Sequence, residues 1–216
     1  MQLHLIWDFD GTLYDTYPQM AQTLCDALAD LGRQADPAEA YALIKRTVFF
    51  AIREYAVRYN LPAETLQEGF FRRHMQDTVF PPMPGMMDCL RQASRMGCRH
   101  YLFTHRGYLA KAQLAADGLD SLFVDAVTHE DGFPDKPAPD AILHLMKKHG
   151  FTAGDALMVG DRDIDILSGR AAGTRGILMD PDGYYRETAV DFRVQTLTEI
   201  PALLRKLEAE REAPRP

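Results

Sequence analysis

The sequence predicts an α/β protein with a doubly wound parallel sheet and a small α-helical domain inserted after the first strand. Two observations carry this prediction. Short apolar segments alternate with amphipathic helical segments through most of the chain, and this alternation is typical of strand–helix–strand units. One stretch near the N-terminus, residues 15–82, has helical periodicity throughout and contains no convincing strand.

Composition sets the broad class. The chain has 216 residues and is 46% hydrophobic, which is enough for one sizeable core and a small insertion. Its net charge of -7 argues against a nucleic-acid-binding surface. The three cysteines have no metal-ligand spacing, so we expect reduced thiols in a cytoplasmic protein. We find no signal-peptide pattern and no apolar run of membrane-spanning length, so no membrane partner is expected.

The first predicted strand covers residues 3–7 and ends in an acidic turn. Asp8 and Asp10 follow the strand, and Gly11 permits the tight turn. Two carboxylates so close together repel each other and lose hydration when buried. We therefore expect either a bound cation or a protonated acid at this strand end.

Helices are expected throughout the insertion. Pro18 suits a first helical turn and Gly32 a helix end, and further helical segments are predicted at 37–60 and 62–75. The helical pattern breaks in the proline-rich stretch at 81–85. Most of the basic residues here are expected on solvated helix faces, with one or two able to face an anionic substrate: Lys45, Arg46, Arg53, Arg58, Arg72 and Arg73.

From residue 85 onward the pattern alternates regularly. The predicted strands are 98–103, 122–127, 155–159, 175–179 and 192–194. The predicted helices are 86–96, 108–117, 137–149, one that ends at 172, and 198–207. The polar tail, 209–216, is expected to be disordered.

Four loops carry the distinctive polar side chains. In a parallel sheet the carboxyl ends of the strands share one edge, so residues about 150 positions apart can meet there. The side chains that we expect to meet are Asp8 and Asp10, Thr104, Lys136, and Asp161 with Asp165.

These side chains suit phosphoryl transfer. Asp8, Asp10 and Asp161 offer only oxygen ligands, which favours Mg²⁺, and no His/Cys cluster competes for zinc. Lys136 brings a positive charge to a phosphoryl oxygen, and Thr104 adds a hydroxyl donor. Positioning and charge neutralisation of this kind supply most of the catalysis in phosphoryl transfer.

The same loops resemble the four motifs of the haloacid dehalogenase (HAD) superfamily, in order, over about residues 5–207. The layout is similar to that of its phosphoglycolate-phosphatase-like members, which have a Rossmann-like core and a helical cap. The matching segments are Asp8-Phe9-Asp10-Gly11-Thr12, Tyr101-Leu102-Phe103-Thr104, Lys136-Pro137-Ala138-Pro139, and Gly160-Asp161 followed by Asp165.

The resemblance implies a role for each matching residue. Asp8 would be the nucleophile that forms an aspartyl-phosphate, and Asp10 would protonate the leaving alcohol and then activate water. Thr104 and Lys136 would hold the phosphoryl group. Mg²⁺ would be held by Asp8, the Asp10 backbone carbonyl and Asp161, with Asp165 supporting the metal waters or Lys136. The remaining predicted phosphate or substrate contacts are Gly11, Thr12, His105 and Arg106.

One departure from the family pattern concerns His105 and Arg106. Relatives often have Asn or Gly after the motif II Thr, whereas this chain has His105. His105 is either a plain loop residue or, with Arg106, a contact for substrate anions.

The resemblance also implies a domain layout. Residues 1–14 and 83–208 would form the HAD core, and 15–82 the cap that closes over the substrate. The expected partner is a small phosphorylated metabolite, with the protein a monomer or weak homodimer.

Three alternatives to a Mg²⁺-dependent phosphatase stay open at this point. A sugar phosphomutase of the β-phosphoglucomutase type would use the same Asp8 and Asp10. A non-catalytic regulatory protein would have no reason to keep so unfavourable a charge cluster. A dehalogenase would need neither the Asp10 acid nor the metal.

Overall fold

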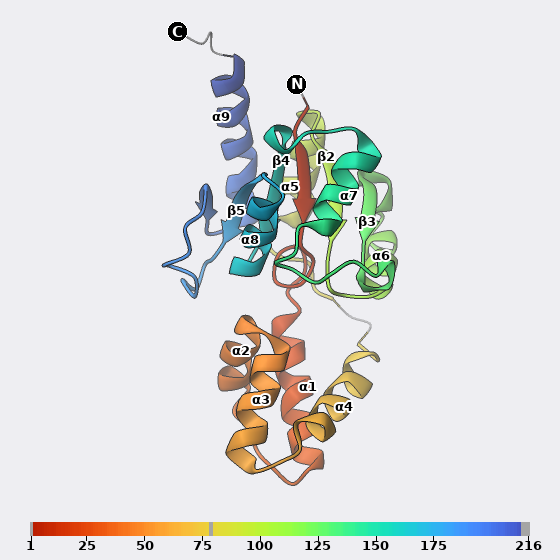
Figure 1. Cartoon of the computed structure of the whole chain (residues 1–216), viewed down its shortest axis with the longest axis vertical. Helices are drawn as coiled ribbons and strands as arrows, with labels where there is room; N and C mark the ends of the chain where they lie inside the picture. The colour runs from red at the N-terminus through yellow and green to blue at the C-terminus, as the bar shows by residue number, and fades with distance from the viewer. Residues whose placement is uncertain (1, 78–79, 213–216) are drawn as a thin grey trace. The chain divides into compact units, whose positions relative to one another are not determined.

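The computed structural model describes residues 2–77 and 80–212 (Figure 1). The chain divides into two units. One unit joins the segment that ends at Tyr14 to the segment that starts at Pro82, and the other is Asp15–Pro81. Each unit has its own core and is described separately.

A six-stranded parallel sheet forms the centre of the first unit. Its strand order is β3-β2-β1-β4-β5-β6, so the order reverses between β1 and β4. In the register, Trp7 of β1 lies opposite Leu102 of β2 and Val159 of β4. The doubly wound parallel sheet expected from the sequence is confirmed. The strands are β1 His4–Trp7, β2 Arg99–Phe103, β3 Phe123–Val127, β4 Ala156–Gly160, β5 Arg175–Met179 and β6 Phe192–Val194.

Helices cover both faces of this sheet (Figure 1). On one face, Ile6, Tyr101 and Met158 pack in one apolar cluster with residues of α7 such as Leu145. The helix α8 also contacts β4 and β5. The helices are α5 Met86–Arg95, α6 Leu109–Ala116, α7 Asp140–His149, α8 Asp163–Ala171 and α9 Ile200–Glu212.

On the opposite face, a buried polar chain joins the sheet to α5. Trp7 Nε1 donates to His100 Nδ1 at 2.9 Å, and His100 Nε2 lies 3.0 Å from Ser94 Oγ on α5. The helix α9 packs against α5 on this side. Because residues that alternate along β1 and β2 meet different helices, both faces are buried, as a parallel sheet requires.

The last helix corrects one expectation. α9 continues to Glu212, so the prediction of a disordered tail is wrong for residues 209–212. The rest of that predicted tail, 213–216, lies outside the described residues. Within the described part of the chain, every helix is too short or too polar to cross a bilayer.

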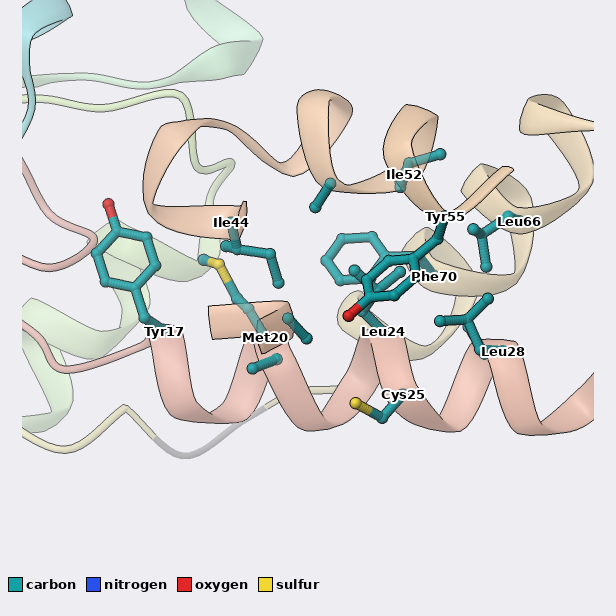
Figure 2. Close-up of a cluster of buried hydrophobic side chains, with 14 residues drawn as sticks. Tyr17, Met20, Leu24, Cys25, Leu28, Ile44, Ile52, Tyr55, Leu66 and Phe70 are labelled. Carbon is teal, nitrogen blue, oxygen red and sulfur yellow. The ribbon is translucent and has the colours of Figure 1, made fainter. Parts of the chain in front are cut away.

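The described residues of the second unit form four helices around an apolar core (Figure 2). All four helices contribute to it: Tyr17, Leu24 and Leu28 come from the first, Ile44 from the second, Ile52 and Tyr55 from the third, and Leu66 and Phe70 from the fourth. The helices are α1 Tyr17–Asp30, α2 Pro37–Arg46, α3 Val48–Tyr59 and α4 Ala63–His74.

The single helix predicted at 37–60 is wrong, because Thr47 divides it into α2 and α3. Thr47 is extended, with φ -161° and ψ 155°, and its side chain accepts a hydrogen bond from Phe50 N at 2.9 Å. A threonine side chain that caps a new helix start explains the break. Asn60 ends α3 in the left-handed conformation, as expected.

Candidate active site

The acidic side chains meet where the strand order reverses. Asp8 follows β1 and Asp161 follows β4, its neighbour in the sheet. Both carboxylates are buried, and Thr12 Oγ1 donates to Asp161 Oδ1 at 3.2 Å, which links the two loops. Ligands of open α/β sheets bind at such a position, beyond the carboxyl ends of the strands.

Lys136 joins this group from the loop before α7. Its ammonium donates to Asp8 Oδ1 at 2.6 Å and to Asp165 Oδ1 at 2.7 Å, and its side chain is fully buried. Residues 128 positions apart therefore form one ion-paired cluster at the sheet edge.

Asp165 is held from the first turn of α8. Its Oδ2 accepts a hydrogen bond from Arg162 N at 3.0 Å, and its Oδ1 accepts from Lys136. The close approach explains Gly160, because a Cβ there would lie 2.3 Å from the Asp165 Cβ. Asp165 thus caps a helix and positions Lys136 at the same time.

The cluster carries excess negative charge around Asp8. Burial and the neighbouring Asp165 raise the pKa of Asp8, although Lys136 and Arg162 act to lower it. Burial also disfavours charge on Asp165, but Lys136 and Arg162 hold its pKa below the usual value. Burial opposes charge on Lys136 as well, yet the two carboxylates raise its pKa. A cation near Asp8 would relieve this repulsion.

The donor set fits a hard divalent cation. One oxygen from each of Asp8, Asp161 and Asp165 lies within 4.8 Å of the others. Among the described residues, none hydrogen-bonds the buried Asp8 Oδ2. Carboxylate-only ligation of this kind suits Mg²⁺. Because both Asp165 oxygens are already engaged, Asp8 and Asp161 are the better ligands.

The loop after β2 contributes three neighbouring residues. Thr104 is buried, and its hydroxyl oxygen accepts from Arg106 N at 3.0 Å, which leaves the hydroxyl proton for another acceptor. His105 Nε2 accepts from Lys136 N at 2.8 Å. Burial, followed by Lys136 and Arg162, lowers the pKa of His105 to about 4, so its ring is neutral and able to accept this bond. His105 therefore positions the Lys136 loop.

Arg106 reaches back to the first motif. Its guanidinium forms a two-pronged ion pair with the Asp10 carboxylate, with a shortest distance of 2.6 Å. The predicted acid of the reaction is thus held by a residue from another loop. The Asp10 carboxylate lies outside the group of three convergent carboxylates. The predicted metal ligand of this residue is its backbone carbonyl, not its side chain.

Gly11 and Thr12 shape the first loop. Gly11 has a φ of +77°, and its amide donates to Tyr14 O at 2.7 Å. The Thr12 side chain is engaged with Asp161. Their predicted contact with a phosphate stays a prediction.

Sequence reasoning missed Arg162. Its positive charge lowers the pKa of both Asp8 and Asp165. The sequence did contain a signal for this role. Arg162 lies between Asp161 and Asp163 in an acidic turn, and a single cation among acidic residues offsets their repulsion.

The fold and site together define the class: a doubly wound α/β protein with convergent carboxylates and a buried lysine at its switch point. A family model of haloacid dehalogenase-like hydrolases matches residues 4–173, and the chain belongs to this family.

Several relatives are phosphoglycolate phosphatases. The protein of that name from Pseudomonas savastanoi pv. phaseolicola is 30% identical over an alignment of 180 positions, and the alignment covers 78% of this chain and 66% of that protein. The plasmid-borne phosphoglycolate phosphatase from Cupriavidus necator is 30% identical over an alignment of 213 positions, and the alignment covers 91% of this chain and 90% of that one. The chain thus spans about two thirds of the length of the first relative.

Solved structures agree on the fold. A hydrolase from Streptococcus pneumoniae TIGR4 is 28% identical, with a TM-score of 0.65 over 95% of this chain and all of that one. A predicted phosphoglycolate phosphatase from Haemophilus somnus 129PT has a TM-score of 0.81 at 19% identity, over 94% of this chain and 98% of that one, which shows the fold alone. The predictions of a HAD-superfamily enzyme with a Rossmann-like core and phosphoglycolate-phosphatase-like relatives are confirmed.

Proposed function

We propose that this HAD-family enzyme is a Mg²⁺-dependent phosphatase that hydrolyses a small phosphorylated metabolite through an aspartyl-phosphate on Asp8. The observation that carries the proposal is the buried Lys136 ammonium bonded to Asp8 Oδ1, while Asp8 Oδ2 has no hydrogen bond from the described residues. Relatives named phosphoglycolate phosphatase favour a phosphate ester of a small acid.

In the first step, an Asp8 carboxylate oxygen attacks phosphorus and the bond from phosphorus to the ester oxygen breaks. Asp10 gives its proton to the departing alcohol oxygen. In the second step, water attacks the phosphorus of the aspartyl-phosphate, Asp10 takes a proton from this water, and Asp8 is restored as phosphate leaves.

Lys136 and Thr104 serve the transferring group. Lys136 favours the ionised, nucleophilic form of Asp8 and places a positive charge beside the phosphoryl oxygens. The Thr104 hydroxyl offers its proton to one of these oxygens. His105, through its bond to Lys136 N, holds the lysine loop in place.

Asp8 Oδ2, Asp161 and the Asp10 backbone carbonyl would hold the magnesium ion. When bound, it supplies positive charge that offsets the carboxylates and orients the phosphoryl oxygens. Asp165 would not bind the metal directly, because its carboxylate accepts hydrogen bonds from Lys136 Nζ and Arg162 N. Thr12 fixes the Asp161 carboxylate.

The helical unit is proposed to act as the cap that selects the leaving alcohol, as caps that exclude water do. We further propose a cytoplasmic location, supported by three free cysteines, and a monomer or weak homodimer that needs neither nucleic acid nor membrane.

Phosphate release from p-nitrophenyl phosphate and a panel of phosphorylated metabolites tests this function. The assay is run with Mg²⁺ and with EDTA. We expect release that requires the metal and a ranking led by esters of small acids. Conversion of a sugar phosphate into its isomer, without net phosphate release, would contradict a phosphatase and indicate a mutase.

A further inference from the structure

Both oxygens of the Asp10 carboxylate are held by Arg106. Nε of Arg106 donates to Oδ1 at 2.9 Å and to Oδ2 at 3.2 Å, and Nη2 donates to Oδ1 at 2.6 Å. The Arg106 side chain is only 4% exposed and that of Asp10 14%. The pair is therefore a largely buried, two-pronged contact, which is stronger and more directional than a solvated surface ion pair.

The backbone anchors Arg106 beside the proposed phosphoryl site. Its amide donates to Thr104 Oγ1 at 3.0 Å, and its carbonyl accepts from His129 N at 3.2 Å. The guanidinium carbon lies 5.6 Å from the centre of the Phe9 ring. The guanidinium itself holds Asp10, the proposed acid that must reach the ester oxygen, so an anionic group beside that oxygen would meet Arg106.

The pair conflicts with the proposed work of Asp10. A carboxylate that accepts from a guanidinium on both oxygens cannot at the same time present a proton to a leaving alcohol. The pair must open before Asp10 acts. Opening separates a buried guanidinium from this carboxylate, which is unfavourable because buried charges need partners. A second anion on the substrate would take the place of Asp10.

We propose that Arg106 determines specificity by exchanging Asp10 for a second anionic group on the leaving alcohol, which frees the Asp10 carboxylate to take up a proton from solvent and pass it to the leaving oxygen. The inference rests on the phosphatase function proposed above. The substrate class is a phosphate monoester with a carboxylate or second phosphate close to the ester oxygen. Both groups match the planar guanidinium fork.

Three esters with one two-carbon skeleton test this assignment: 2-phosphoglycolate, ethane-1,2-diol bisphosphate and ethyl phosphate. The kcat/KM of each is measured for the native protein, Arg106→Gln and Arg106→Lys. In Arg106→Gln, the preference for an anionic ester over ethyl phosphate should fall roughly 10- to 100-fold, as expected for a lost hydrogen bond between charged groups. Arg106→Lys keeps the charge but loses the fork, so it should lose part of this preference.

Arg99→Gln is the matched control, because Arg99 begins the strand that Arg106 follows. It should keep the native preference. The two anionic esters show which group Arg106 binds. If Arg106→Gln lowers the preference for 2-phosphoglycolate over ethyl phosphate, the group is a carboxylate. If it lowers the preference for the bisphosphate instead, the group is a second phosphate.

An equal loss on all three esters in Arg106→Gln would overturn the assignment of Arg106 and leave the phosphatase function standing. Release of phosphate from none of the esters by the native protein would overturn both. If Arg106→Gln does not fold, the Kd of 2-phosphoglycolate is measured by calorimetry instead. The two proteins compared are the Asp8→Asn variant and the double variant Asp8→Asn, Arg106→Lys. Weaker binding with the lysine supports the exchange, and unchanged binding overturns it.

Discussion

Lys136 is a buried charged residue whose environment has to compensate its positive charge. Its ammonium is fully buried and is shared between two carboxylates at 2.6 and 2.7 Å. Removing one partner of a buried ion pair leaves uncompensated charge behind. Lys136 therefore serves both the chemistry and the local stability.

Replacing Lys136 by Met should reduce kcat/KM by roughly 10²-fold or more, since removing one preformed electrostatic contact to a transition state has about this effect. Phosphate release measures the loss, and urea unfolding shows how much of it comes from destabilisation. Lys111→Met is the control, because that lysine is 46% exposed and pairs with Asp131 at 3.4 Å. A native kcat/KM in Lys136→Met would contradict the role given to this ammonium.

His100 is a second residue whose charge state follows from its contacts. Trp7 Nε1 donates to its Nδ1, so that nitrogen carries no proton and the ring is neutral. Burial lowers its pKa from 6.5 to about 4. The unfolded chain therefore binds a proton more readily than the folded one between these values.

The native protein should accordingly lose stability as the pH falls from about 6.5 towards 4, by up to about 3 kcal/mol from this group. Stability above pH 6.5 should be unaffected by it. Urea unfolding across this range, for the native protein and His100→Gln, measures the difference. Parallel pH profiles for the two proteins would show that His100 does not carry the effect.

At the scale of elements, the sheet edge was predictable and the helix break was not. Asp8 and Thr104 follow apolar strands directly, so the local pattern and the parallel topology were enough to bring them together. Thr47 lies inside a continuous helical pattern, and only its cap geometry ends α2. Helical periodicity is insensitive to one such residue, which is why two helices were predicted as one.

The cap at Thr47 makes a direct prediction. Thr47→Ala removes the acceptor for Phe50 N and should reduce the free energy of unfolding by about 1 kcal/mol. Thr47→Ser keeps the oxygen and should lie close to the native value. Chemical denaturation of the three proteins makes the comparison, and equal destabilisation by Ala and Ser would rule out the cap as the cause.

At the scale of the whole molecule, the fold class and the four motif loops were predictable, whereas the pairing of Arg106 with Asp10 was not. The two residues are 96 positions apart, and their contact depends on side-chain direction. The sequence showed only that Arg106 lies two residues after the motif II Thr. Likewise, the tail from 209 is polar, yet α9 includes its first four residues.

Bound Mg²⁺ should stabilise the whole protein, since a ligand that binds only the folded state adds about 2.7 kcal/mol at 100 times its Kd. Saturating Mg²⁺ should therefore raise Tm, and EDTA should remove the increase. Asp161→Asn should abolish the shift. Asp163→Asn, which changes the neighbouring acid outside the convergent group, should keep it. A full Mg²⁺ shift in Asp161→Asn would place the metal elsewhere.

The central claim is that Asp8 carries the phosphoryl group during turnover. Acid quenching during steady-state hydrolysis of 2-phosphoglycolate, followed by peptide mass spectrometry, tests it directly. We predict one phosphoryl group on Asp8 in the native protein. In Asp8→Asn we predict neither the modification nor turnover, with the native unfolding profile retained. Hydrolysis that continues in Asp8→Asn, or a phosphoryl group on another residue, would contradict the account.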